Sequence, residues 1–262
     1  MTKTRHVIVH YHIYKNSGTS FDHVLAHSFG DRHQLFDGPF PFFTIGQDEL
    51  DTIIQRQPRT LAFSSHQIAL PQPTSLTYRP LAAVFLRNPL LRIGSIYRFK
   101  RQSDDGTSTS DAARRMDFAE WIAHCFASPR EIVHISNAQT RLLSQPYGRR
   151  PLRQRSPEGM EYDLDMARRN LSNVELLGRT EQFEDDVRRF SDLLAPLGLT
   201  LRLPDDLRKN VTQDADLPVD ERVGRLLDQL DPALRQQLIS ANSQDLALYD
   251  HACRLIAANL PV

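Results

Sequence analysis

A six-residue turn near the N-terminus has the composition of a phosphate-binding site. It consists of Lys15, Asn16, Ser17, Gly18, Thr19 and Ser20. The turn separates an apolar run, Val7 to Tyr14, from apolar residues at helical spacing, so it joins a strand to a helix. Such a turn directs backbone N–H groups and the positive end of the helix dipole at one point. Gly18 allows close backbone approach and Lys15 adds positive charge. A helix N-cap formed by Thr19 or Ser20 is the structural alternative.

Arg87 and Ser95 form a second group that could bind an anion. Arg87 follows the apolar run Leu81 to Leu86, and Pro89 is a helix start signal that places Ser95 on the second helical turn. The two side chains could then share one phosphate through charge-assisted hydrogen bonds. Taken singly, Arg87 could form a structural ion pair and Ser95 could be an exposed helix serine. The two sites together suit a nucleotide that is phosphorylated at both ends of its ribose.

The first turn differs from the phosphate loop of nucleotide triphosphatases. In G-x-x-x-x-G-K-[ST] the lysine follows the glycine, whereas Lys15 precedes Gly18 by three positions. Such enzymes also need an acid at the end of a neighbouring strand to hold magnesium, and Arg87 and Asn88 stand at that place. An ATP-dependent small-molecule kinase is therefore only the alternative enzymatic function.

The order of apolar runs and helical patterns predicts an α/β fold with a central, mostly parallel sheet flanked by helices. Four runs are candidate buried strands: Val7 to Tyr14, Thr60 to Ser64, Leu81 to Leu86 and Val174 to Leu177. Helices are expected over Phe21 to Phe29, Leu90 to Arg101, Glu181 to Leu194 and Asp231 to about Ala258. No boundary divides the chain, so we expect a single domain over residues 1–262.

Two irregular segments interrupt these elements. Residues 102–115 are polar and small, which predicts a loop. Residues 141–155 hold five arginines and no acid. This composition fits either a solvated surface loop or a binding surface for an anionic substrate.

The chain has 262 residues and zero net charge, but the charge is divided unevenly. Residues 1–155 hold 20 basic and 12 acidic side chains, and nine of the ten histidines, so we expect the anion-binding chemistry there.

The apolar runs are too short to cross a bilayer, and we expect no signal sequence before the first strand. Cys125 and Cys253 lack metal-ligand spacing. We expect a soluble, cytoplasmic protein without a nucleic-acid partner.

In sequence order, the motifs resemble those of sulfotransferases that use 3′-phosphoadenosine 5′-phosphosulfate. The closest branch is that of heparan sulfate 2-O-sulfotransferase and its bacterial relatives. Its first motif, close to His-Ile-Pro-Lys-Thr-Gly-Gly-Thr-Ser, stands here as residues 12–20, with Tyr14 for proline and Asn16 for threonine. Its second, Leu-Arg-Asp-Pro followed by Arg and Ser-x-Tyr, stands as residues 86–97, with Asn88 for aspartate. Four further stretches also look familiar: Asn137–Arg141, Gly178–Phe183, Asn210–Thr212 and Asp245–Tyr249.

The resemblance implies a fold similar to that of P-loop nucleotide triphosphatases and a reaction that moves a sulfonate to an acceptor hydroxyl. The product of the donor is adenosine 3′,5′-bisphosphate, and no metal is required. The turn at residues 15–20 would bind the 5′ end, with Lys15 at the leaving oxygen, and Arg87 with Ser95 would bind the other phosphate. We expect a saccharide as the acceptor. The sequence does not fix the oligomeric state.

His66 is the expected catalytic base. It follows an apolar run at the strand's carboxyl end, where open α/β sheets bind ligands. The family has Gly-His at this place, and the chain has Ser65-His66. His10 and His12 are alternatives, but histidines inside a strand are more often core groups.

The sequence pattern alone does not assign roles to several other residues. The resemblance suggests donor or acceptor contacts for Asn137, Gln139 and Arg141, and places Gly178 to Glu181 near the adenine. A noncatalytic protein that binds anionic glycans is the third functional class, and only the arginine-rich segment favours it.

Overall fold

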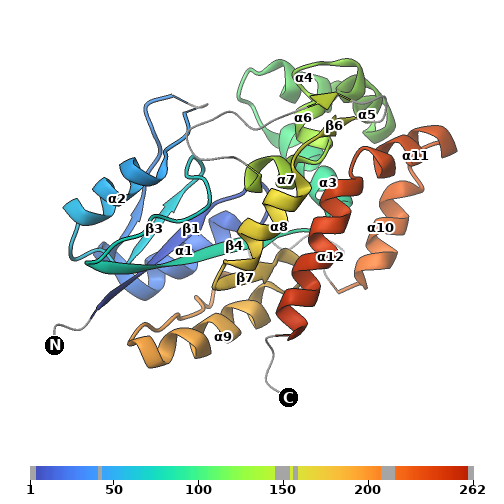
Figure 1. Ribbon diagram of the computed structural model, residues 1–262. Coiled ribbons are helices and arrows are strands. Elements are labelled where there is room, and N and C mark those ends of the chain that lie inside the picture. Colours follow the sequence, from blue (N-terminus) through green and yellow to red (C-terminus); the bar gives the residue numbers. More distant parts are fainter. Residues whose placement is uncertain (1–3, 41–42, 145–153, 156–158, 208–215, 259–262) are drawn as a thin grey trace.

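A parallel sheet of five strands, in the order β2-β3-β1-β4-β7, forms the centre of the computed structural model (Figure 1). The structure describes residues 4–40, 43–144, 154–155, 159–207 and 216–258. The strands are β1 (Arg5–Tyr11), β2 (His33–Leu35), β3 (Ala62–Ser65), β4 (Tyr78–Leu86) and β7 (Leu176–Arg179). All pairings are parallel, so the carboxyl ends of the strands meet at one edge. The predicted α/β class with a parallel sheet is confirmed.

Helices cover both faces of the sheet because β1 is apolar on both sides. Val7, Val9 and Tyr11 belong to one core, and Ile8 belongs to the other, as the two-residue repeat of a strand requires. The first core is closed by α2 (Gln47–Arg56), α8 (Leu164–Ser172) and α12 (Ser243–Ala258). The second core is closed by α1 (Gly18–Phe29) and α9 (Phe183–Leu194).

A third, helical part packs around the buried Trp121. Figure 1 shows its green and orange-red helices on the same side of the molecule. Its helices are α3 (Pro89–Gln102), α4 (Ser108–Arg115), α5 (Phe118–Ala127), α6 (Ile132–Ile135), α10 (Val219–Leu227) and α11 (Pro232–Ser240). Between this part and the sheet lie α7 (Ala138–Leu143) and a small antiparallel pair, β5 (Gln154–Arg155) with β6 (Met160–Glu161). No helix in the described ranges is long and apolar enough to cross a membrane.

The predicted loop at residues 102–115 is wrong for its second half, which forms α4. The polar residues there are a cap: the Thr107 side chain accepts the Ser110 N–H, and Asp105 accepts the Thr107 N–H. Ala113 is fully buried in the third core. The polar residues at the start of this short helix therefore led to the prediction of a loop.

The single helix predicted from Asp231 to Ala258 is also wrong, because it is two helices, α11 and α12. The buried Asn242 lies between them, and its amide donates to the Ile135 and Leu238 carbonyls. These bonds turn the chain between the two helices. Most of the arginine-rich segment and the stretch Asn210–Thr212 lie outside the described residues.

Candidate functional site

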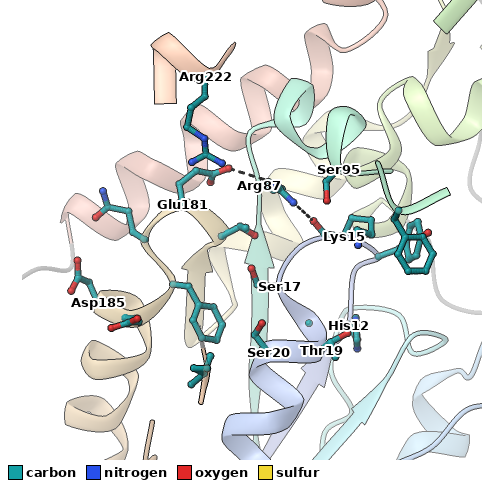
Figure 2. Close-up of a pocket in the computed structure, with 18 of the residues that line it drawn as sticks. His12, Lys15, Ser17, Thr19, Ser20, Arg87, Ser95, Glu181, Asp185 and Arg222 are labelled. Carbon is teal, nitrogen blue, oxygen red and sulfur yellow. Dashed lines mark hydrogen bonds and ion pairs between the residues drawn. The ribbon is translucent and has the colours of Figure 1, made fainter. Parts of the chain in front are cut away.

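A cavity of about 750 Å³ opens at the carboxyl edge of the sheet. Its walls come from the segments that follow β1, β3, β4 and β7, with further residues from α3 and α10. Figure 2 shows several of these side chains. Eight of the nine predicted site residues line it: Lys15, Ser17, Gly18, Thr19, Ser20, His66, Arg87 and Ser95. Segments far apart in the sequence thus meet where the motifs predicted a shared ligand.

The first turn has an unusual backbone. Lys15 and Ser17 both have positive φ, at 65° and 59°, a conformation that costs energy for residues other than glycine. Helix α1 begins at Gly18, and the side chain of Ser17 makes no cap hydrogen bond. Thr19 and Ser20 therefore lie inside the helix and do not form the N-cap given as the alternative. The first-turn N–H groups lie beside the cavity, in the arrangement that binds an anion.

Asn16 does not line the cavity, which corrects its assignment as a donor contact. Its side chain is buried, and its amide donates to the Phe85 carbonyl at 2.9 Å and to Gln139 Oε1 at 2.6 Å. The Gln139 side chain also pairs with both the N–H and the carbonyl of Arg87. The two predicted anion-binding segments therefore share one buried support.

Arg87 lies at the end of β4, where the second group was predicted. Its Nη1 donates to the Lys15 carbonyl at 3.2 Å, and its Nε is 3.9 Å from a carboxylate oxygen of Glu181. Burial lowers the pKa of Arg87 to about 10, so the guanidinium stays charged at neutral pH. The ion pair given as the structural alternative is thus present. Ser95 and Arg222 line the same end of the cavity (Figure 2).

A second buried arginine fixes the turn. The Nε of Arg92 donates to the Tyr14 carbonyl at 3.0 Å, and its Nη1 donates to the His134 carbonyl at 3.2 Å. Burial lowers the pKa of Arg92 to about 10. Together with the bond from Arg87 to Lys15, this pairs the carbonyl oxygens of Tyr14 and Lys15, where the turn begins, with guanidinium groups. An anion beside the turn would otherwise meet their partial negative charge.

The Lys15 ammonium rests on an aromatic ring. Its Nζ lies 4.3 Å from the centre of the Phe99 ring, a cation–π distance. Burial lowers the pKa of Lys15, and the charges of Arg87 and Arg98 act in the same direction. The ring contact holds the ammonium at the cavity wall without cancelling its charge.

His66 lies at the cavity, and Asp37 orients its ring. The Asp37 carboxylate accepts the His66 backbone N–H at 2.9 Å and lies 3.1 Å from the ring Nδ1. An ionised carboxylate only accepts, so Nδ1 carries the proton and Nε2 is the basic nitrogen. Burial, and then the neighbouring His12, lower the pKa of His66. A histidine with a lowered pKa is unprotonated at neutral pH, as a general base must be.

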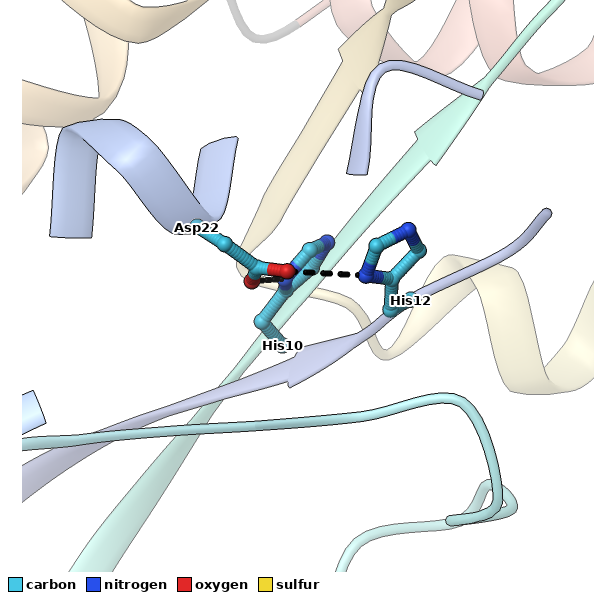
Figure 3. Close-up of side chains that lie close together, drawn as sticks. All are labelled: His10, His12 and Asp22. Atoms are coloured by element: carbon cyan, nitrogen blue, oxygen red, sulfur yellow. Dashed lines mark hydrogen bonds and ion pairs between the residues drawn. The ribbon is translucent and has the colours of Figure 1, made fainter. Parts of the chain in front are cut away.

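His12 also lines the cavity, whereas His10 is buried beneath it. Figure 3 shows both rings against the Asp22 carboxylate, which lies 2.9 Å from His12 Nδ1 and 2.7 Å from His10 Nδ1. Burial lowers the pKa of His10. Although burial opposes it, the hydrogen bonds from both rings hold the pKa of Asp22 well below its usual range. The expectation of core histidines therefore fits His10, whereas His12 is also buried but follows β1 and lines the cavity.

The same three residues are the one group, within the described ranges, whose histidine and carboxylate atoms lie close enough to share a metal ion. Direct hydrogen bonds account better for their spacing. An ion about 2.1 Å from each atom keeps a nitrogen and an oxygen about 3 Å or more apart. The observed pairs are 2.7 and 2.9 Å apart. We therefore treat His10, His12 and Asp22 as a hydrogen-bonded network.

Asn137, Gln139 and Arg141 do not line the cavity, so the suggested ligand contacts are not seen. Asn137 Oδ1 accepts the first N–H groups of α12, and the Asp245 carboxylate accepts the first N–H groups of α7. Helix α12 is thus capped by the residue that precedes α7, and α7 is capped by a residue of α12. The stretches 137–141 and 245–249 are scaffold in this structure. Residues 180–185, by contrast, do line the cavity.

Four contributors to the site were missed by the sequence reasoning. Arg222 comes from α10 and faces the second anion group (Figure 2). Asp37 and Asp22 orient the histidines, and Phe99 holds Lys15. Phe99 had a usable signal, because it lies one helical turn after Ser95 on a predicted helix. The other three carry no local pattern that distinguishes them from surface residues.

Three comparisons relate the chain to known proteins. A family model described as "Sulfotransferase family" matches residues 1–252. An uncharacterized protein of Archaeoglobus fulgidus is 25% identical over 251 residues, which are 94% of this chain and 95% of that protein. The crystal structure of mouse sulfotransferase SULT7A1 complexed with PAP matches with a TM-score of 0.44 and 13% identity, over 98% of this chain and 89% of that one.

Proposed function

The chain belongs to the sulfotransferase family and so is a sulfonate-transferring enzyme, and we propose that it uses 3′-phosphoadenosine 5′-phosphosulfate as donor and a saccharide hydroxyl as acceptor. The observation that carries the donor assignment is the convergence of two cationic groups on one cavity. Lys15 and the start of α1 form the first group, and Arg87, Ser95 and Arg222 form the second. A nucleoside with a phosphate at each end of its ribose presents one anion to each group.

The reaction needs a base, a positive charge at the sulfonate, and stabilisation of the leaving phosphate. In the proposed step the acceptor oxygen bonds to sulfur while the bond from sulfur to the phosphate oxygen breaks, and that oxygen keeps the electron pair. His66 Nε2 takes the hydroxyl proton. Lys15 and the N–H groups of the turn face the leaving oxygen. These groups supply the positive charge, so the proposal requires no divalent cation.

The saccharide acceptor rests on the resemblance to the heparan sulfate 2-O-sulfotransferase branch. The cavity is consistent with a polar acceptor, because hydroxyl, carboxylate and guanidinium groups share its wall. Residues 141–155, which could attract an anionic glycan, lie mostly outside the described ranges, so they do not support the choice.

Calorimetric titration tests the donor. The protein is titrated with adenosine 3′,5′-bisphosphate and, separately, with ATP and magnesium. We expect clear preference for the bisphosphate. Preference for ATP with magnesium would favour the kinase alternative, and binding of neither would contradict the site.

A transfer assay tests the acceptor. The protein is incubated with radiolabelled donor and a panel of desulfated oligosaccharides, simple phenols and primary alcohols. We expect label on a saccharide. Label on a phenol alone would reject the acceptor class but keep the donor, whereas glycan binding without donor affinity would point to a noncatalytic binder.

A further inference from the structure

The histidine end of the cavity holds two imidazoles where the proposed step uses one. The rings of His12 and His66 are stacked, with centroids 3.8 Å apart and planes inclined by 30°. Each has its own carboxylate on Nδ1: Asp22 for His12 and Asp37 for His66. Both Nε2 atoms are therefore free of these carboxylate contacts, on residues that line the same cavity.

His12 lies against the start of helix α1. A Cβ atom added to Gly18 would fall 2.1 Å from His12 Cδ2 and 2.2 Å from His12 Nε2, so only glycine fits beneath this ring. The Nε2 edge of His12 is thus next to the first residue of the helix that is proposed to hold the 5′-phosphate. Because His66 stacks on the His12 ring, His12 touches both the start of α1 and the proposed base. The transferring sulfonate must occupy that same region.

We propose that His12 is a second catalytic residue, whose protonated imidazole donates its Nε2–H to an oxygen of the transferring sulfonate while neutral His66 takes the acceptor proton. The inference rests on the proposed function. The new bond joins the acceptor oxygen to sulfur, the bond to the 5′-phosphate oxygen breaks, and the hydroxyl proton moves to His66 Nε2. His12 keeps its proton throughout, so its part is to stabilise charge on the sulfonate oxygens.

The division of charge between the rings follows from their surroundings. Two stacked imidazoles cannot both be charged without strong repulsion. Asp22 is only 13% exposed, whereas Asp37 is 40% exposed, so Asp22 is screened less by water and holds a cation more strongly. His10 shares Asp22, but burial lowers the pKa of His10 and so favours its neutral form.

The groups that face His66 act on its protonation in opposite directions. Burial favours the neutral ring, and so does the charge of His12, which follows β1. Asp37 after β2 and Asp22 from α1 favour the charged ring. Enzymes make one of two neighbouring groups an acid and the other a base by placing them in environments that move their pKa values apart.

Two substitutions of His12 separate the proposed role from a structural one. The amide of His12→Asn can replace the Nδ1–H bond to Asp22, but it cannot reach the sulfonate. The longer amide of His12→Gln can replace the Nε2–H donor without its charge. The measurement is release of labelled sulfate from the radiolabelled donor with water as acceptor, beside calorimetric binding of adenosine 3′,5′-bisphosphate. His27→Asn, on the exposed end of α1, is the matched control.

We expect His12→Asn to lose turnover by about 100-fold, as removal of one transition-state donor does, while bisphosphate affinity stays within about threefold. His12→Gln should recover part of the loss. Turnover of His12→Asn equal to that of His27→Asn would overturn the proposal. If the unaltered protein did not bind the bisphosphate, the proposed function itself would be rejected.

Histidine proton exchange, followed by nuclear magnetic resonance, gives a test that needs no turnover. The Cε1–H signals of the two rings, assigned with His12→Asn and His66→Asn, are titrated in the free protein and in the bisphosphate complex. We expect the His66 signal to titrate at lower pH than that of an ordinary histidine. In His12→Asn the His66 midpoint should rise by about half a pH unit or more, because a neighbouring positive charge is gone. A His66 midpoint that does not move in His12→Asn contradicts the assignment.

Discussion

The two ends of the cavity are built from different kinds of charge. At one end Arg87 and Arg222 are arginines, which stay charged at any physiological pH. At the other end are the histidines His12 and His66, each paired with a carboxylate, and histidine is the side chain suited to exchanging protons. Permanent charge suits binding of a phosphate that does not react, whereas titratable groups suit the movement of a proton. The difference separates holding the donor from transferring its sulfonate.

The two ends are also supported differently. Arg87 is held through its backbone by Gln139, which itself belongs to a helix capped by a distant residue. The histidines are held directly by Asp22 and Asp37, one hydrogen bond away. Substitutions at the arginine end should therefore change binding, and substitutions at the histidine end should change rate and pH dependence.

Substitution of His66 should have the largest effect. We expect His66→Ala to lower kcat by about 1,000-fold, the order of a lost general base, with little change in bisphosphate affinity. In the unaltered protein the acidic limb of kcat should lie below about pH 6.5, because the lowered pKa of His66 keeps the base unprotonated to more acid pH. The pH–rate profile of His66→Ala should lose that acidic limb. Near-normal turnover in this variant would move the base elsewhere.

Lys15 comes next. Lys15→Ala should lower turnover by about 100-fold, because the leaving oxygen loses its positive partner, and should weaken bisphosphate binding as well. Lys100→Ala is the control, since Lys100 pairs with Asp105 on the surface of the same region. Transfer kinetics and calorimetry together measure both effects. Retained turnover with retained binding would reject the role of Lys15.

Arg222 should affect only the second phosphate. Arg222→Gln should weaken binding of adenosine 3′,5′-bisphosphate by about tenfold, the size of one charge-assisted contact, and leave adenosine 5′-monophosphate unaffected. Arg225→Gln on the same helix is the control, because Arg225 pairs with Glu221 and does not line this cavity. If Arg222→Gln weakened the binding of both nucleotides equally, the sites for the two phosphates would not be separate.

The smallest effect concerns stability. Burial lowers the pKa of His10, so the unfolded chain binds this proton more readily than the folded protein does. The free energy of unfolding should therefore decrease as pH falls below about 6.5, by about 1 kcal/mol over the first pH unit. His10→Asn, which can still donate to Asp22, should flatten this dependence. Urea unfolding at several pH values measures it, and an unchanged slope would count against the buried histidine as its cause.

Local patterns predicted most of the sheet and most of the cavity. Strands β1, β3, β4 and β7 were found because each is a short apolar run beside a turn signal. Strand β2 was missed because its three residues are half-buried or exposed and have no apolar pattern. The turn at residues 15–20 and the pair Arg87 and Ser95 were found because strand ends in a parallel sheet meet at one edge.

Long-range contacts account for what local patterns could not reveal. Asn16 turns inward because Gln139, 123 residues away, accepts a hydrogen bond from its side-chain amide. The break between α11 and α12 depends on contacts of Asn242 with Ile135, which no helical periodicity records. Arg222 reaches the cavity through the packing of α10 on α3. Each feature depends on where two distant segments pack.

Comparison of three ligands on the unaltered protein shows whether one cavity holds two phosphates of one nucleoside. Calorimetry is carried out with adenosine 3′,5′-bisphosphate, adenosine 5′-monophosphate and adenosine 3′-monophosphate, without added metal. We predict that the bisphosphate binds at least about tenfold more tightly than either monophosphate, because each phosphate contributes its own charge-assisted contacts. Equal affinity for the bisphosphate and one monophosphate would contradict the account.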